Sequence, residues 1–107
     1  MYTDEQYWNV LEAITNVHNA IRCETENEAL LLGEILTKAD IRWPGGTPPF
    51  PEHTNWMHYR GGTAYSIDPS NGSLEYCYTE YYINEGFNII DFSSLVEPSI
   101  SLLDLLG

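Results

Sequence analysis

The histidines and cysteines are the side chains best suited to metal binding or nucleophilic catalysis. The three histidines are His18, His53 and His58, and the two cysteines are Cys23 and Cys77. His18 has no metal-ligand partner four residues away, and no H-E-x-x-H pattern, Cys pair or clustered Asp repeat accompanies His53 and His58. A cysteine beside a histidine and an aspartate could act as a thiol nucleophile, but neither cysteine stands at a predicted helix N-terminus that would lower its pKa. The sequence therefore predicts no metal, no cofactor and no enzymatic activity.

The acidic and aromatic residues indicate a different chemistry, the binding of a basic protein. Residues 65–92 contain five of the eight tyrosines, five carboxylates and no lysine or arginine. In a nucleic-acid-binding partner, such carboxylates can pair with the Arg and Lys side chains that otherwise bind phosphate groups. Tyr and Trp are frequent in the hot spots of protein interfaces. The predicted partner-binding residues are the five acids, three of the tyrosines and one tryptophan: Asp68, Glu75, Tyr76, Tyr78, Glu80, Tyr81, Glu85, Asp91 and Trp56.

The charge of the whole chain agrees with this interpretation. Its 107 residues include sixteen acids and four bases, for a net charge of −12, and residues 61–107 hold seven of the acids and no base. Such a surface repels nucleic acid and anionic membranes and attracts basic proteins. A general charge bias that favours solubility, or a proteome adapted to high salt, is the alternative explanation.

The expected location is the cytoplasm. The N-terminus lacks the basic start and apolar run of a signal peptide, and no apolar run approaches the ~20 residues that span a bilayer. The two cysteines have no disulfide-rich context and are expected to be free thiols.

Length and composition favour a single α+β domain in four parts. The parts are a helical hairpin at 1–40, a loop rich in Pro, Gly and aromatic residues at 41–62, a β-meander at 63–92 and a C-terminal helix at 93–107. We expect the hairpin to pack on one face of an antiparallel sheet of three or four strands, with the C-terminal helix closing the domain.

Two capping boxes mark the predicted helices. Thr3 is followed three residues later by Gln6, and Thr25 by Glu28. Apolar residues then recur at spacings of three and four as far as Ile21 in the first helix, and the second helix is expected to end by residue 40. The short connection between them favours an antiparallel hairpin.

Three strands are expected in the meander, at 63–67, 73–83 and 87–92. Asn71-Gly72 is the strongest turn signal, because this pair favours a tight hairpin. The middle strand shows no clearly polar face. Either a bulge near Thr79 and Glu80 shifts its register, or the sheet has its core on one face and a tyrosine-bearing interface on the other.

The two remaining segments allow more than one role. The loop 41–62 is expected to be ordered over the core, with a short strand at 56–60, either as a binding loop or as a lid that closes the core. The end of the chain, from Pro98 to Leu106, is rich in leucine and either docks on the sheet or forms a homodimer with a second copy. A structural, oligomer-forming accessory protein is thus the alternative function.

Residues 61–107 resemble the C-terminal half of SUKH-type immunity domains. The resemblance rests on Gly61-Gly62-Thr63-Ala64-Tyr65-Ser66-Ile67-Asp68-Pro69-Ser70-Asn71-Gly72-Ser73-Leu74-Glu75-Tyr76, followed after two more strands by Phe92-Ser93-Ser94-Leu95 and a leucine-rich end. It implies an α+β fold and binding of a bacterial toxin, often a nuclease, and it assigns no functional residue.

The predicted function is therefore stoichiometric inhibition of a basic protein. In one setting the chain is an immunity protein against a nuclease toxin. In the other it is a phage-type DNA mimic with an anti-defence role, which disables a host nuclease or DNA-binding protein. Neither setting involves direct contact with nucleic acid or membrane.

Overall fold

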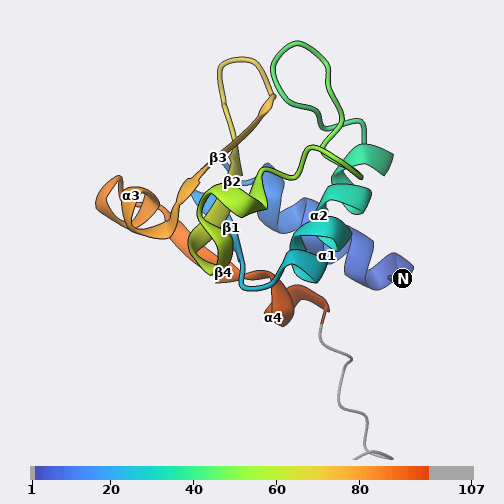
Figure 1. Ribbon diagram of the computed structural model, residues 1–107, viewed down its shortest axis with the longest axis horizontal. Coiled ribbons are helices and arrows are strands. Elements are labelled where there is room, and N and C mark those ends of the chain that lie inside the picture. The colour runs from blue at the N-terminus through green and yellow to red at the C-terminus, as the bar shows by residue number, and fades with distance from the viewer. Residues whose placement is uncertain (1, 97–107) are drawn as a thin grey trace, which may run out of the picture.

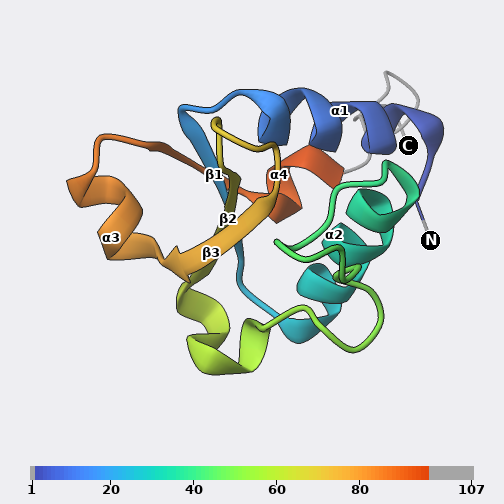
Figure 2. The same cartoon turned by 90° about the horizontal axis from the view of Figure 1, so that it is seen from above.

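A four-stranded sheet stands at the centre of the structure, a computed structural model that describes residues 2–96. The strands are β1 (Asn19–Cys23), β2 (Thr63–Ile67), β3 (Leu74–Tyr78) and β4 (Asn88–Asp91), in the order β3-β2-β1-β4. The helices are α1 (Asp4–Thr15), α2 (Glu26–Lys38), α3 (Thr79–Asn84) and α4 (Phe92–Val96), with 3-10 turns η1 (Trp56–His58) and η2 (Arg60–Gly62). Helices α1 and α2 lie on one side of the sheet and α3 on the other (Figures 1 and 2). The predicted α+β class is confirmed.

Helix α1 begins where the first capping box predicts but ends six residues before Ile21. Thr3 accepts the backbone N–H of Gln6, and Gln6 accepts that of Thr3. The helix stops because Asn16 leaves the helical conformation and its side chain accepts the N–H of His18. The side chain of Asn19 then donates to the carbonyl oxygen of Ala13, an otherwise orphaned group near the helix end, at 3.1 Å.

Strand β1 is the main correction to the predicted fold. It occupies the central part of the sheet, between β2 and β4, so α1 and α2 are joined through a strand and do not form a hairpin. The residues from Ala20 to Cys23 are all apolar except Arg22, a short run that fits a buried strand as well as a helix. The run forms a strand and not a helix because its residues are buried on both faces of the sheet, Ile21 in the larger apolar cluster and Ala20 in the smaller one.

The predicted hairpin at Asn71-Gly72 is confirmed, but the antiparallel meander is not. Strands β2 and β3 pair antiparallel, with Tyr65 opposite Tyr76. Strand β3 then ends at Tyr78, and α3 carries the chain across the sheet, so that β4 pairs parallel with β1 instead of antiparallel with β3. Neither a bulge nor a long two-faced strand is present at 79–83, because these residues are helical.

Two apolar clusters hold the layers together. The larger one joins α1, α2, α4 and one sheet face, and its largest fully buried side chain is Phe92. The smaller one lies on the opposite face, where α3 packs Tyr82 against Ala20 and Ala64. The sheet is therefore covered on both faces, more completely on the side of α1 and α2.

The loop 41–62 is ordered over the larger cluster, as predicted. Trp43 and Trp56 pack against that cluster, and Pro49 is fully buried. The predicted strand at 56–60 is wrong. Asn55 and Arg60 adopt left-handed backbone conformations (φ 60° and 51°), and these interrupt an extended chain and leave the two 3-10 turns.

The chain beyond Val96 lies outside the described residues. Within the predicted C-terminal helix at 93–107, the structure describes only the part up to Val96, in α4, which begins one residue earlier, at Phe92. The predicted roles of the leucine-rich end, docking or homodimer formation, fall on residues the structure does not describe.

Candidate functional site

An aromatic cluster surrounds Tyr76 where β3 meets the loop. Its members are Trp43, His58, Tyr59, Tyr65, Tyr76 and Tyr78. The ring of Tyr76 lies 5.5 Å from Trp43, 5.5 Å from His58 and 6.0 Å from Tyr59, between ring centroids. The imidazole Nδ1 of His58 is hydrogen-bonded to the hydroxyl of Tyr76. The cluster thus joins the edge strand to the loop through packed rings.

The cluster runs from the core to the surface. Tyr65 is buried at its inner end, where its hydroxyl donates to the carbonyl oxygen of Thr54 at 2.7 Å. Burial raises the pKa of Tyr65 well above its ordinary value. At the outer end, Tyr59 and Tyr78 lie 5.6 Å apart and remain 43% and 45% exposed. Tyr59 and Tyr78 form what we name the aromatic rim.

The predicted tyrosines therefore divide between two roles. Tyr78 lies in the aromatic rim, and Tyr76 is half-buried beneath it. Tyr81 is exposed on α3, on the opposite side of the sheet from α1 and α2, with its ring against Tyr82. Tyr76 and Tyr78 lie two residues apart in β3 and therefore share a face of the sheet, whereas Tyr81 is set apart because the chain turns into α3 at Thr79.

The predicted acids are spread around β3 and α3. Glu75 is exposed on β3 next to Asp68, and desolvation by the sheet, followed by the charge of Asp68, raises its pKa. Asp68 accepts hydrogen bonds from the hydroxyl (2.7 Å) and backbone N–H (2.8 Å) of Ser70, and these hold its pKa below the usual value. Glu80 and Glu85 are exposed at the two ends of α3. Within residues 2–96, none of these four acids forms an ion pair.

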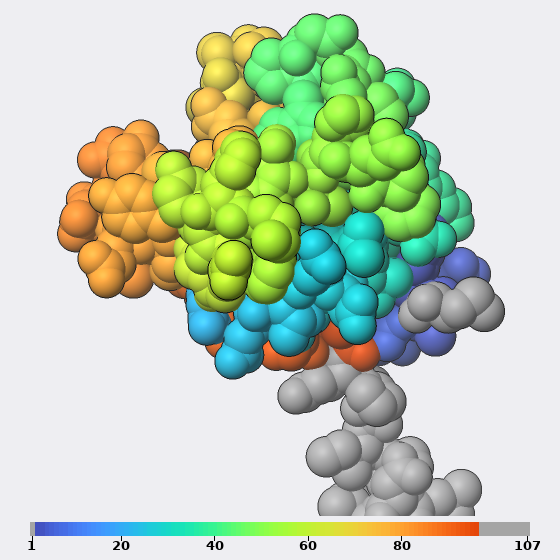
Figure 3. All heavy atoms as spheres, viewed as in Figure 1, coloured from blue at the N-terminus to red at the C-terminus, as the bar shows by residue number. Residues whose placement is uncertain are grey.

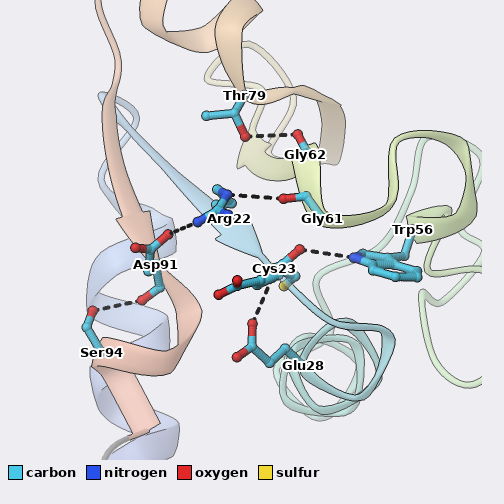
Figure 4. A network of polar contacts seen from close by, with 10 residues as sticks. Arg22, Cys23, Glu28, Trp56, Gly61, Gly62, Thr79, Asp91 and Ser94 are labelled. Atoms are coloured by element: carbon cyan, nitrogen blue, oxygen red, sulfur yellow. Dashed lines mark hydrogen bonds and ion pairs between the residues drawn. The ribbon is translucent and has the colours of Figure 1, made fainter.

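The side chains of Asp91 and Trp56 both bind other residues of the same chain. Asp91 forms an ion pair with Arg22 at 2.7 Å, and Arg22 also donates to the carbonyl oxygen of Gly61 (Figure 4). The indole N–H of Trp56 donates to the carbonyl oxygen of Cys23 at 3.0 Å, and this contact anchors the loop to β1. A role of either residue in partner binding remains a prediction.

Met57 and Tyr59 are the surface residues that sequence reasoning missed. Both lie in the segment expected to be a strand, which the structure folds into 3-10 turns. The left-handed residues Asn55 and Arg60 bracket this segment, and of the two only Asn favours that conformation by residue type. The base Arg60 lies next to Tyr59, and no residue in the described part of the chain pairs with its charge.

The groups considered for catalysis are not brought together. Burial raises the pKa of the Cys23 thiol well above its ordinary value, the opposite of what a nucleophile needs. Cys77 packs in the smaller cluster beside Tyr82. Among residues 2–96, no three His, Cys, Asp or Glu side chains gather as a metal site would require. The helices described in this range are all too short or too polar to cross a membrane.

Tyr82 lies on the sheet face opposite the larger cluster, and its burial predicts that the folded protein loses stability at alkaline pH. The hydroxyl of Ser66 donates to its phenol oxygen at 2.9 Å, and burial raises the pKa of Tyr82 to about 12. Below pH ~10 the phenol is neutral whether the chain is folded or unfolded. Between pH ~10 and ~12 only the unfolded chain loses the proton, so the free energy of unfolding should fall by about 2 kcal/mol.

Urea denaturation at a series of pH values between 8 and 12 measures this effect. Tyr82→Phe should make the alkaline decline shallower, and the part that remains comes from Tyr65 and Cys23, whose pKa values burial also raises. Tyr81→Phe, the same exchange at an exposed neighbour, is the matched control. An unchanged decline in Tyr82→Phe would show that another group causes it.

Comparison of the chain with protein families, curated proteins and solved structures found no match.

Proposed function

We propose that this protein is a small acidic inhibitor that binds one to one to the basic surface of a nuclease or another nucleic-acid-binding protein. The observation that carries the proposal is the exposed aromatic rim, on a part of the chain whose four predicted acids, spread over the β2–β3 turn, β3 and α3, form no ion pair within residues 2–96. Exposed aromatic residues flanked by unpaired charge are typical of binding surfaces.

The rim and the acids contribute in different ways. Glu75, Glu80 and Glu85 attract and orient a basic partner and pair with its Arg and Lys side chains. The rings of Tyr59 and Tyr78 provide rigid contact area that excludes water from the centre of the interface. Because the acids face solvent, they act mainly on the association rate and the salt dependence of binding.

Two biological settings fit this chemistry. The resemblance to SUKH-type immunity domains favours an immunity protein that neutralises a nuclease toxin. A chain with a net charge of −12 also suits a phage-type DNA mimic that disables a host defence protein. The identity of the captured protein distinguishes the settings.

Affinity capture at low salt, followed by an activity assay, tests the proposal. The tagged chain should retain a basic nuclease or DNA-binding protein, and the purified pair should lose nuclease or DNA-binding activity at a molar ratio of one to one. Capture of a protein whose activity is unchanged at saturating inhibitor would contradict inhibition. Capture of acidic proteins only would contradict the proposed electrostatics.

Single charge changes of opposite sign should have opposite effects on the affinity of that pair. Glu80→Gln should weaken binding about twofold to fivefold, and Arg60→Gln should strengthen it by a similar factor, because exposed charges contribute less than ~1 kcal/mol each. Raising the salt from about 50 mM to about 500 mM should weaken the wild type about tenfold or more. Calorimetry at both salt concentrations measures these changes, and equal affinity at the two would contradict the electrostatic part.

A further inference from the structure

A groove lies between the first turns of α2 and the loop segment that leads into η1. Its volume is about 290 Å³. The lining residues that matter here are Glu26, Leu30, Glu52, Trp56, Met57 and His58. Figure 3 shows the two segments that form it on one face, the start of α2 in cyan beside the loop in light green. None of the sequence patterns indicated this hollow, because its walls come from two segments far apart in the chain.

Hydrogen bonds hold the loop wall of the groove in place. Besides the bond from its indole to Cys23, Trp56 accepts the hydroxyl of Thr63 at its carbonyl oxygen, at 3.1 Å. Thr54 accepts the hydroxyl of Tyr65 at 2.7 Å. These bonds tie the wall to β1 and β2, so the groove exists before any partner binds. Because the loop is already ordered, binding does not carry the entropic cost of ordering it.

The lining combines apolar surface with negative charge. Leu30, Trp56 and Met57 supply the apolar part, and Met57 is 57% exposed. Glu26 and Glu52 are both exposed, and neither forms an ion pair within residues 2–96. No Lys or Arg lines the groove. The groove therefore suits a group that is apolar along its length and positively charged at its end.

An arginine side chain has this form. Its methylene stem packs on apolar surface while its planar guanidinium binds carboxylates with two donors at once and stacks on aromatic rings. Lysine shares the charge but lacks the plane and the paired donors. A hollow of 290 Å³ is too small for a folded segment and adequate for one such side chain.

We propose that this groove receives an arginine side chain from an extended basic segment of the partner. This inference rests on the proposed function and adds a specific binding site to it. His58 lines the groove and is hydrogen-bonded to Tyr76 of the aromatic cluster, so the groove adjoins that cluster. The partner would place one arginine in the groove while its neighbouring residues contact the rim.

Titration with short capped peptides, followed by the backbone and indole signals in ¹⁵N NMR, tests the groove without any partner. Acetyl-Gly-Arg-Gly-amide should shift the signals of Glu26, Leu30 and Met57 and the indole signal of Trp56. The lysine peptide should bind about threefold or more weakly. The citrulline peptide, which has nearly the same shape without the charge, should cause no saturable shift. Equal shifts with citrulline, or arginine shifts confined to other surfaces, would overturn the proposal.

Paired charge variants locate the effect. Glu26→Gln/Glu52→Gln should weaken binding of the arginine peptide about fivefold or more, whereas Asp4→Asn/Glu12→Gln removes the same charge from α1 and should leave it unchanged. Equal loss in both pairs would indicate attraction to net charge alone and overturn the site. If Glu26→Gln disturbs α2, the single variant Glu52→Gln tests the groove instead, because Glu52 lies outside any helix.

The two proposals fail in different ways. If the arginine peptide binds and no basic protein is captured, the groove is an arginine-binding site but the proposed inhibitor function is wrong. If the captured partner binds Glu26→Gln/Glu52→Gln as tightly as the wild type, the inhibitor function stands and the groove is not its contact. A chain that sediments as a dimer, and becomes monomeric in Arg60→Gln, would assign the groove to Arg60 of a second copy and overturn the assignment to a partner.

Discussion

Replacing Phe92 with alanine should lower the free energy of unfolding by about 3–5 kcal/mol. Phe92 is the largest fully buried side chain, and it stands at the junction of β4 and α4. Its ring belongs to the larger cluster, which joins α4 to α1, α2 and the sheet. Removing it leaves a cavity between elements from both ends of the described chain, which have little freedom to collapse around it.

Urea denaturation followed by circular dichroism measures this loss. Ile83→Ala is the control, because Ile83 is 56% exposed on α3 and its truncation should cost less than ~1 kcal/mol. A cost near ~1 kcal/mol for Phe92→Ala would mean that α4 is not required to close the core.

Removing both tyrosines of the aromatic rim should weaken partner binding by about 2–4 kcal/mol, a loss of about 30-fold or more in affinity. Tyr59 and Tyr78 touch each other at the exposed end of the aromatic cluster. Their truncation removes two exposed rings and would admit water to the centre of the proposed interface. The loss should appear mainly as faster dissociation, because the charges that govern association are unchanged.

Trp8→Ala is the matched control for Tyr59→Ala/Tyr78→Ala. Trp8 is a larger aromatic residue, 64% exposed, and it lies on α1 away from the rim. Surface plasmon resonance with the captured protein should show wild-type kinetics for Trp8→Ala. If Trp8→Ala weakens binding and the rim variant does not, the interface lies on α1.

Sequence patterns predicted the parts of the fold that depend on neighbouring residues. The capping residues Thr3 and Thr25 place the starts of α1 and α2, and Asn71-Gly72 places the β2–β3 turn. These signals work because the hydrogen bonds involved join residues only a few positions apart.

The errors arise where distant contacts decide the structure. Ile21 fits the apolar period of the first helix, yet it is in a strand because Tyr65 and Ile90 pair with it on both sides. Tyr82 favours a strand by type, yet it is helical because α3 must bring it against Ala64.

The sequence predicted which kinds of residue the candidate site contains, but not how they are arranged in space. Sequence alone predicted Tyr78 and the acids of the β2–β3 turn, β3 and α3 as binding residues, since residue type and charge are visible there. The contributions of Tyr59 and Met57, and the groove beside Glu26 and Glu52, depend on how the loop folds back on α2. Only the three-dimensional structure brings these segments together.

The central position of β1 governs the order in which the protein can fold. This strand precedes both of its neighbours along the chain, since β2 and β4 come from the middle and the end of the described residues. A ribosome-bound chain that has emerged only as far as α2 therefore has no strand against which to pair β1. Contacts between such distant residues slow folding, because long loops must close before the contacts can form. One edge of β1 can pair with β2 once β2 has been synthesised, but the other edge has no partner until β4 follows, so we expect the complete sheet to form only then.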